Sequence, residues 1–201
     1  SLSGMLVPGG LKIVDMNRDG VLDNNDRTDL GNPYPDFNWG ITNTFKYKNI
    51  DFSFLVQGVQ GGKVINGDPN YNESRRTIKI YNQNRWVSAA NPGDGKTPFS
   101  TNGYNWMLTD YVIENGSYFA LREVNLGYTL PTSSIKKLKI TSMRFYLSAQ
   151  NLYFHTAKGY RSLNPEGRFS NGPYSSVLID GYQRGAFPIP QTITAGIDIN
   201  F

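Results

Sequence analysis

Apolar and polar residues alternate along residues 37–59 in the manner of two β-strands. Between Phe37 and Tyr47 most odd-numbered positions are apolar, and the even-numbered ones carry asparagine, glycine, threonine or lysine. A similar alternation runs from Ile50 to Val59, after the short link Lys48-Asn49. Because successive side chains of a strand point to opposite faces, each segment has one apolar and one polar face. The pattern predicts a β-hairpin.

Three more segments alternate in the same way, at 119–130, 143–150 and 192–201. In the first of them, the apolar residues before Arg122 are out of phase with those after Glu123. One extra residue in a strand produces such a shift, so the pattern predicts a β-bulge near Arg122-Glu123.

The spacing of these five segments favours a membrane barrel over a soluble β-sandwich. The predicted strands are roughly 9–13 residues long, enough to cross a bilayer at a tilt. Short links at 48–49 and 131–140 alternate with long loops at 61–116 and 155–190, as in outer-membrane barrels. A sandwich also alternates, but its strands are shorter on average and its links need not sort by length. Five strands do not close a transmembrane barrel, so in the barrel interpretation the chain is part of a larger one.

The two interpretations assign different surroundings to the apolar faces, which meet lipid in a barrel and form the core in a sandwich. The residues concerned are Phe37, Trp39, Ile41, Ile50, Phe52, Phe54, Ile193, Ile197 and Ile199. In a barrel, the residues of the polar faces line the lumen or touch a plug domain; they include Thr42, Thr44, Gln57, Arg144, Gln150 and Asp198. Tyr47, Tyr128 and Phe201 lie at strand ends on the apolar side, where an interfacial aromatic girdle is expected.

Composition is typical of β structure and excludes several classes of function. The 201 residues include 21 glycines and 13 tyrosines but no cysteine, which excludes disulfides and thiolate metal sites. The net charge is +4, and no Lys/Arg tract is long enough to predict binding to nucleic acid. No apolar run is long enough to predict a transmembrane helix.

Residues 15–26 have the ligand spacing of an EF-hand calcium loop. Oxygen-bearing side chains occupy loop positions 1, 3, 5, 9 and 12, glycine occupies position 6, and the residue at position 7 offers its carbonyl. The candidate Ca²⁺ ligands are Asp15, Asn17, Asp19, Val21, Asp23 and Asp26. Position 12 is aspartate rather than glutamate, and its shorter arm favours binding through one oxygen.

The flanks of this loop do not predict the two helices of an EF-hand. Residues 11–14 have a β-branched pair and predict a strand, and Gly31-Asn32-Pro33 would end any exiting helix. The alternative to metal binding is a solvated turn whose Asp and Asn side chains bond only to neighbouring amides. In favour of Ca²⁺, four crowded carboxylates repel one another without a cation.

The sequence predicts no enzyme. It contains a single histidine, His155, and neither a G-x-S-x-G motif nor a phosphate-binding glycine loop. Flat amphipathic rings in the long loops are candidates for stacking on sugar rings or for contact with a lid protein, with packing inside their own loops as the alternative. They are Trp86, Tyr104, Trp106, Tyr160 and Tyr174.

An ordered set of segments resembles the C-terminal end of SusC/RagA-family TonB-dependent transporters. The strongest is Tyr118-Phe119-Ala120-Leu121-Arg122-Glu123-Val124-Asn125-Leu126-Gly127-Tyr128-Thr129-Leu130-Pro131. The others, in chain order, are Asp15-Met16-Asn17-Arg18-Asp19-Gly20 with Asp26-Arg27, Gly31-Asn32-Pro33-Tyr34-Pro35-Asp36-Phe37, residues 52–58, Ser148-Ala149-Gln150-Asn151-Leu152, Asn164-Pro165-Glu166 and the terminal Phe201. The resemblance covers nearly the whole chain.

The resemblance implies an all-β fold, an antiparallel transmembrane barrel of about 22 strands plugged by a separate domain. Residues 1–201 would be the C-terminal part of that barrel, with an extracellular loop at 1–36 and about five strands with their loops at 37–201. The plug and the TonB box are expected outside these residues. The family topology places the loops 61–117 and 155–190 outside the cell, together with the acidic loop.

The implied function is TonB-dependent import of oligosaccharides, or of peptides in some members, across the cell outer membrane. The implied partners are a SusD-like surface lipoprotein that forms a lid, the TonB complex, and the lipid bilayer. An alternative from a different class is a secreted, calcium-stabilised β-sandwich that binds carbohydrate.

Overall fold

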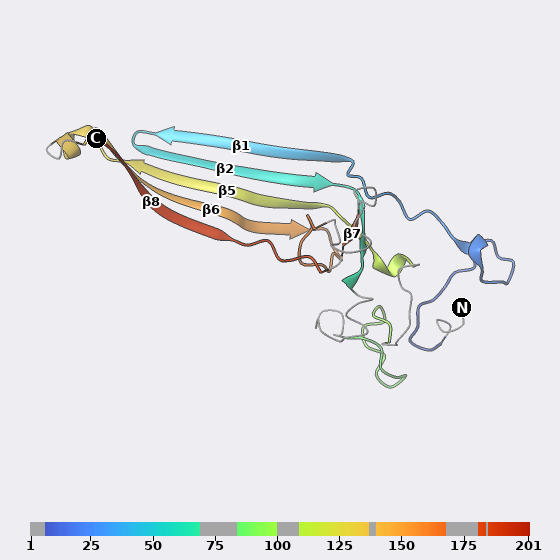
Figure 1. Ribbon diagram of the computed structural model, residues 1–201. Helices are drawn as coiled ribbons and strands as arrows, with labels where there is room; N and C mark the ends of the chain where they lie inside the picture. Colours follow the sequence, from blue (N-terminus) through green and yellow to red (C-terminus); the bar gives the residue numbers. More distant parts are fainter. Residues whose placement is uncertain (1–6, 69–83, 100–108, 137–139, 168–180, 184) are drawn as a thin grey trace. The chain divides into compact units, whose positions relative to one another are not determined.

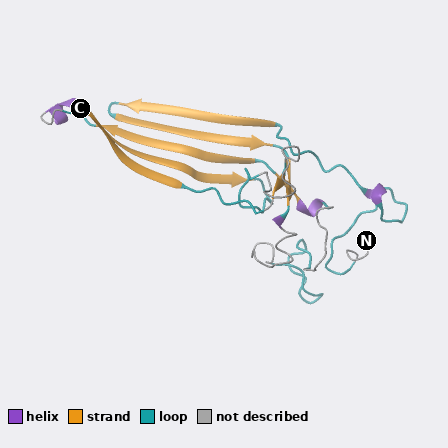
Figure 2. Ribbon diagram, in the orientation of Figure 1, coloured by secondary structure: helices purple, strands orange, loops and turns teal. Residues whose placement is uncertain are grey.

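The computed structural model describes residues 7–68, 84–99, 109–136, 140–167, 181–183 and 185–201. Strands predominate among these residues, and helices are short (Figure 2). No helix in the described ranges has the length and apolar character of a membrane span. The chain divides into two compact units: the sheet unit (34–62, 115–166 and 187–201) and the loop unit (1–33, 63–114 and 167–186).

The sheet unit is built on a five-stranded antiparallel sheet with the order β1-β2-β5-β6-β8 (Figure 1). Its strands are β1 (Phe37–Tyr47), β2 (Ile50–Gln60), β5 (Tyr118–Thr129), β6 (Ser142–Thr156) and β8 (Thr192–Asn200). The five predicted strands and the antiparallel all-β class are therefore confirmed. A short helix, α3 (Thr132–Ile135), follows β5 in the link to β6.

The predicted hairpin joins β1 to β2 through Lys48-Asn49. Tyr47 pairs with Ile50, which leaves a two-residue loop. Lys48 has a φ of 52°, a left-handed conformation that suits two-residue hairpins. The side-chain amide of Asn49 donates to the carbonyl of Thr129 at 2.7 Å and so ties the hairpin to β5.

β5 carries the predicted bulge. On the β2 side, Leu55 pairs with Glu123 and Val56 pairs with Leu121, so Arg122 is skipped. The pairing with β6 also shifts at this point. The extra residue brings the apolar side chains before and after it onto one face, which is what the change of phase in the sequence indicated.

The loop unit contains a small three-stranded sheet with the order β4-β3-β7. Its strands are β3 (Lys63–Asn66), β4 (Ile113–Asn115) and β7 (Tyr182–Gln183), and two 3-10 helices are η2 (Asn24–Asp26) and η4 (Asp110–Val112). β3 and β7 run parallel. Strands this short show no alternation, and the sequence did not predict them.

The core of the loop unit is part apolar and part polar. Val112 is fully buried and packs against six half-buried side chains: Leu11, Ile13, Ile65, Phe99, Tyr111 and Ile113. Beside these, the buried Asn66 donates from Nδ2 to Oε1 of the buried Glu114 at 2.8 Å. The contacts join chain segments that are far apart in sequence, so these segments fold as one unit.

The strand predicted over residues 11–14 is wrong. These residues are not paired in a sheet. Leu11 and Ile13 lie against Val112, whereas Val14 is 58 % exposed. The alternation in this segment reflects one face packed on a small core, a condition that does not require a neighbouring strand.

Candidate functional site

One face of the five-stranded sheet is apolar and uncovered. Its rows run from strand to strand: Phe45 pairs with Phe52, Phe52 with Leu126, and Leu126 with Leu147. The large side chains on this face that are more than one third exposed are Phe37, Ile41, Phe45, Tyr47, Ile50, Phe119, Leu126, Tyr128, Phe145, Leu147, Tyr153, Ile193, Ile197 and Ile199. The residues predicted to face lipid or a core therefore share one surface, which no second layer of described residues buries.

Aromatic rings lie near both ends of this apolar face. At the hairpin end these are Tyr47, Tyr128 and Phe145. At the other end are Trp39, which packs over Gly58, and a cluster of Phe119, Tyr153 and His155 with ring centroids 5.1–6.4 Å apart. Tyr47 is eight residues beyond Trp39, about 27 Å along a strand and about 20 Å at a tilt of roughly 40°. This spacing approaches the height of the lipid-facing band of outer-membrane barrels.

The opposite face is polar and carries an ion-paired cluster near the hairpin end. Arg144 on β6 contacts Asp51 on β2 through two bonds, Nη2 to Oδ2 at 2.6 Å and Nε to Oδ1 at 3.2 Å. Its Nη1 lies 3.5 Å from Oδ2 of Asp198 on β8. Gly127 on β5 lies beneath the pair, where a Cβ would come within 2.5 Å of Asp51 Oδ1. The arginine thus connects three strands across a fourth.

A second cluster surrounds the bulge residue Arg122. Its Nε donates to Gln57 on β2 at 3.0 Å, and its Nη1 donates to Asn151 on β6 at 3.2 Å. Its Nη2 pairs with Glu166, whose Oε1 also accepts from the hydroxyl of Tyr118 at 2.8 Å. Because Glu166 lies ten residues beyond the end of β6, this contact holds the start of the following loop against the sheet.

The remaining polar residues predicted to face inward lie on this same face. Thr42 pairs with Leu55, Thr44 with Ser53, and Gln150 with Thr192. The face therefore offers hydroxyl, amide and paired charged groups, and it matches the chemistry of a lumen or of a plug contact.

In the acidic loop, the aspartates accept hydrogen bonds from the loop's own backbone. Asp15 accepts from the amides of Arg18 at 2.6 Å and Gly20 at 2.8 Å. Asp26 accepts from the amides of Met16 at 2.8 Å and Asp23 at 2.9 Å, which closes the loop. Asn17, Asp19 and Asp23 each accept from the amide two residues later. These are the bonds expected of an Asx-rich turn.

These bonds stabilise the ionised form of Asp26. The amide of Asp23 is the largest cause that lowers the pKa of the Asp26 carboxyl below its usual value, and the amides of Met16 and Asn17 add to it. Gly20 has a φ of 82°, the left-handed conformation that an EF-hand loop needs at position 6. No group of three or more carboxylate or histidine side chains within the described residues is arranged to hold a metal ion. The loop has the turn and the oxygen donors of a Ca²⁺ site, with its carboxylates engaged by backbone amides.

Two of the five candidate contact aromatics lie in described residues. Trp86 packs over Gly9, and its ring meets that of Phe99 edge-on at 6.2 Å. Tyr160 is half-buried in the loop after β6, and its amide bonds to the carbonyl of Ala157 at 3.1 Å. Tyr104, Trp106 and Tyr174 lie outside the described residues. Trp86 thus contacts its own unit, and a role in ligand or lid binding stays a prediction for all five.

Sequence reasoning missed the roles of Arg122, Glu166 and Gly127. Arg122 and Gly127 stood inside the segment with the strongest family resemblance. The hydrogen-bond partners of Arg122 are 29 and 65 positions away, and the two side chains that cross Gly127, Asp51 and Arg144, are 93 positions apart. The register of the strands brings these residues together, and no local sequence pattern shows it. A glycine on the polar face between charged residues of neighbouring strands was the available signal, because such a glycine leaves room for a long side chain to cross.

Comparison with known proteins identifies relatives along the whole chain, although no family model matches it. It is 32% identical over 198 residues to TonB-dependent receptor P26 of Formosa agariphila, which is 97% of this chain and 20% of the relative. It is 23% identical over 189 residues to TonB-dependent receptor SusC of Bacteroides thetaiotaomicron, which is 94% of this chain and 17% of SusC. The chain therefore spans about one fifth of the length of the curated relatives it matches.

Solved structures show the same fold. The RagAB peptide importer in its closed-closed state matches 91% of this chain with a TM-score of 0.66 at 20% identity, over 20% of that chain. The open-open state matches 84% with a TM-score of 0.61 at 21% identity, over 17% of that chain. The likeness to RagAB and to SusC agrees with the resemblance noted in the sequence. The sequence relatives show the family: the chain belongs to the TonB-dependent receptors and corresponds to about one fifth of such a receptor.

Proposed function

We propose that the chain forms part of the wall of an outer-membrane barrel that imports nutrients. The observation that carries the proposal is the division of the sheet into an uncovered apolar face and a polar, ion-paired face. In water, a continuous apolar surface of this kind is unfavourable and promotes association. In a bilayer the same surface meets lipid, and the polar face meets the lumen or its plug.

The edges of the sheet support membership of a larger barrel. Among the described strands, β1 pairs only with β2, and β8 pairs only with β6. Unpaired backbone amides and carbonyls are not tolerated in the hydrocarbon core of a bilayer. Further strands of the longer protein are therefore needed on both sides.

The cargo of this importer is an oligosaccharide or a peptide, taken up with a SusD-like lipoprotein as lid and with energy from the TonB complex. The support is the relationship to SusC and the likeness to the RagAB peptide importer. The polar groups around Arg122 and Arg144 suit both cargo types, because hydroxyl, amide and charged groups bond to sugars and peptides alike.

The proposal is tested with the full-length gene in its own bacterium. We expect the protein to fractionate with the outer membrane, and we expect its deletion to abolish uptake of one labelled class, oligosaccharide or peptide. Re-expression of the wild-type gene is the control, and it should restore that uptake. Recovery of the full-length protein in the soluble fraction, or unchanged uptake of both classes, would contradict the proposal.

The sandwich alternative requires a second sheet on the apolar face. Phe45, Leu126 and Ile197 are 55 %, 47 % and 55 % exposed, so the described residues provide no such layer. The barrel interpretation explains the exposure directly, and it is the one we adopt.

We also propose that the acidic loop binds Ca²⁺ as a structural ion. Asp15, Asn17, Asp19, Asp23 and Asp26 would supply side-chain oxygens, and Val21 its carbonyl. Each carboxylate oxygen that accepts one amide keeps a second lone pair for a cation. The test is calcium binding by the full-length protein and by its Asp15→Ala/Asp19→Ala variant. Equal uptake by the two proteins would leave the loop as an Asx-rich turn without metal.

A further inference from the structure

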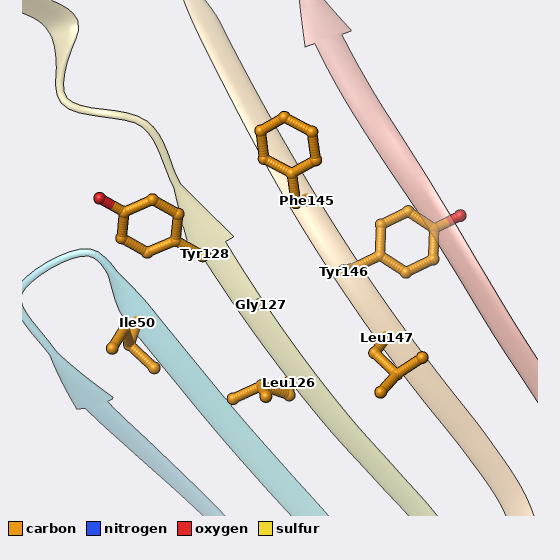
Figure 3. A pocket seen from close by; sticks show the side chains of 7 residues that line it. All are labelled: Ile50, Leu126, Gly127, Tyr128, Phe145, Tyr146 and Leu147. Atoms are coloured by element: carbon orange, nitrogen blue, oxygen red, sulfur yellow. The ribbon is translucent and has the colours of Figure 1, made fainter. Parts of the chain in front are cut away.

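The apolar face of the sheet is hollowed near its hairpin end (Figure 3). The hollow has a volume of about 380 Å³. It is lined by Ile50, Leu126, Tyr128, Phe145 and Leu147 of the apolar face, and also by Gly127 and Tyr146, a cross-strand pair that belongs to the polar face. Two cross-strand pairs form its sides: Tyr128 with Phe145, and Leu126 with Leu147. Figure 3 shows these four side chains around one opening, with Ile50 of β2 beside them.

The hollow is complete in this chain. Its lining comes from β2, β5 and β6, and each of these strands has both of its neighbours in the described sheet. Strands added at the outer edges of β1 and β8 would therefore not fill it. Its size falls in the usual range of small-ligand sites, and its aliphatic and aromatic lining favours an apolar ligand.

A positive charge lies at the end of the same face. The Nζ of Lys48 lies 5.4 Å from the centroid of the Tyr47 ring, and Tyr47 pairs with Ile50, which lines the hollow. The other link at this end of the sheet contains the exposed Lys136 among its described residues. The hydroxyl of Tyr128 points away from Leu126 in Figure 3 and is available as a donor. Cations and a phenol suit an anionic phosphate.

We propose that this hollow is a binding site for one glycerophospholipid, with an acyl chain between the Tyr128/Phe145 and Leu126/Leu147 pairs and the phosphate near Lys48. The proposal rests on the proposed function, because it requires the apolar face to lie in a bilayer. The bound lipid would belong to the leaflet of the bilayer at the hairpin end of the sheet, where the short links between strands lie.

Selectivity for one lipid comes from shape and charge rather than from hydrophobicity. Lipid tails and leucine side chains are about equally apolar, so burial of the tail alone does not distinguish a site from the rest of the face. The side chains of the hollow would contact the acyl chain of the lipid from two sides, and Lys48 would provide one charged contact to the headgroup. A lipid that lacks the phosphate should therefore bind less well.

The test is native mass spectrometry of the full-length protein, delipidated in detergent and titrated with phosphatidylglycerol, phosphatidylethanolamine or diacylglycerol. We expect one tightly held phospholipid per protein and weaker retention of diacylglycerol. Leu147→Trp should fill the hollow and reduce phospholipid affinity about tenfold or more. Lys48→Gln should reduce it about fivefold, the change expected for one lysine at a membrane surface. Ile193→Trp is the matched control, since it adds the same ring to the same face on β8, away from the hollow, and should leave affinity unchanged.

The site would be overturned by the absence of retained phospholipid, by equal losses of affinity in Leu147→Trp and Ile193→Trp, or by equal retention of diacylglycerol and phospholipid. Retention of an outer-leaflet glycolipid in place of phospholipid would also overturn it. Each of these outcomes leaves the protein in the outer membrane with its uptake intact. Failure of the proposed function appears differently, as a full-length protein that fractionates away from the membrane.

Discussion

Arg144 reaches Asp51 across an intervening strand. The guanidinium starts on β6 and the carboxylate on β2, and their closest atoms are 2.6 Å apart. β5 lies between them and presents Gly127 at the crossing. Because the contact is bidentate and both side chains are about one third exposed, it orders the polar face at the hairpin end without a buried charge.

Gly127→Ala should separate this pair. The new Cβ would lie 2.5 Å from Asp51 Oδ1 and also against the guanidinium, so one of the two flexible side chains must move. We expect a loss of about 1 kcal/mol in the free energy of unfolding, the upper end for exposed ion pairs. Urea unfolding of the refolded full-length protein measures it.

The control for this change is Gly40→Ala on the same face. A Cβ there would lie 3.8 Å from Gln57 Cγ, an ordinary contact, and we expect a change within about 0.5 kcal/mol. Equal losses at Gly40 and Gly127 would show that the effect comes from the strand backbone and not from the ion pair.

Asp51 and Asp198 should contribute unequally to the Arg144 cluster. Asp51 accepts two short bonds, whereas Asp198 lies 3.5 Å from Nη1 and is 57 % exposed. We therefore expect Asp51→Asn to lower the free energy of unfolding by about 1 kcal/mol and Asp198→Asn by less than half of that. A double-mutant cycle with Arg144→Met gives the coupling of each pair. A larger coupling for Asp198 would contradict the geometry.

The strands of the sheet could be predicted from the sequence, whereas the side-chain contacts between them could not. The strands of the sheet were predictable because each has one apolar and one polar face, and side chains therefore alternate along β1 and β8. The Arg144–Asp51 pair was not, since it depends on the register of three strands and residues 93 positions apart. β3 and β7 are too short to alternate. The acidic loop was recognisable from the spacing of its oxygen-bearing side chains. Its hydrogen bonds from backbone amides to carboxylates could not be predicted, because they depend on the backbone conformation.

Arg122 should limit the access of a protease to the loop after β6. Its contact with Glu166 holds residues 157–166 against the sheet, and Lys158 and Arg161 in that segment are cleavage sites for trypsin. Arg122→Gln removes the charged contact, which is worth about 1.4 kcal/mol or more. Since cleavage follows the population of the open loop, we expect it to accelerate about tenfold.

Thr42→Gln is the control for the Arg122 variant, because Thr42 is an exposed residue of the same face, on β1. It should leave cleavage after Lys158 and Arg161 at the wild-type rate. Unchanged cleavage in Arg122→Gln would mean that other contacts hold the loop.

The acidic loop should lose order when Asp26 is protonated. The pKa of Asp26 is lowered in the folded chain, chiefly by the amide of Asp23. A carboxyl of lowered pKa stabilises the folded loop at pH above its unfolded value of 3.8, and this contribution disappears as the pH falls through the lowered value. Asp26→Asn removes the charge at neutral pH and should speed tryptic cleavage after Arg18. Asp29→Asn, whose carboxylate bonds to Gly31 instead, should not; equal cleavage in the two variants would contradict a closing role for Asp26.

Adjacent residues of β1 provide the sharpest test of which face meets lipid. Ile41 is 53 % exposed on the apolar face, and Thr42 is exposed on the polar face. An arginine on the lipid side of a barrel costs about 2–4 kcal/mol near the bilayer midplane and less toward the interfaces, whereas a lumen position tolerates it. We therefore expect Ile41→Arg to lower the free energy of unfolding in lipid vesicles by about 2 kcal/mol, and Thr42→Arg to change it by less than about 0.5 kcal/mol. If the apolar face met water instead, both substitutions would be nearly neutral. If it were covered by another protein layer, Ile41→Arg would destabilise the protein equally in vesicles and in detergent-free buffer.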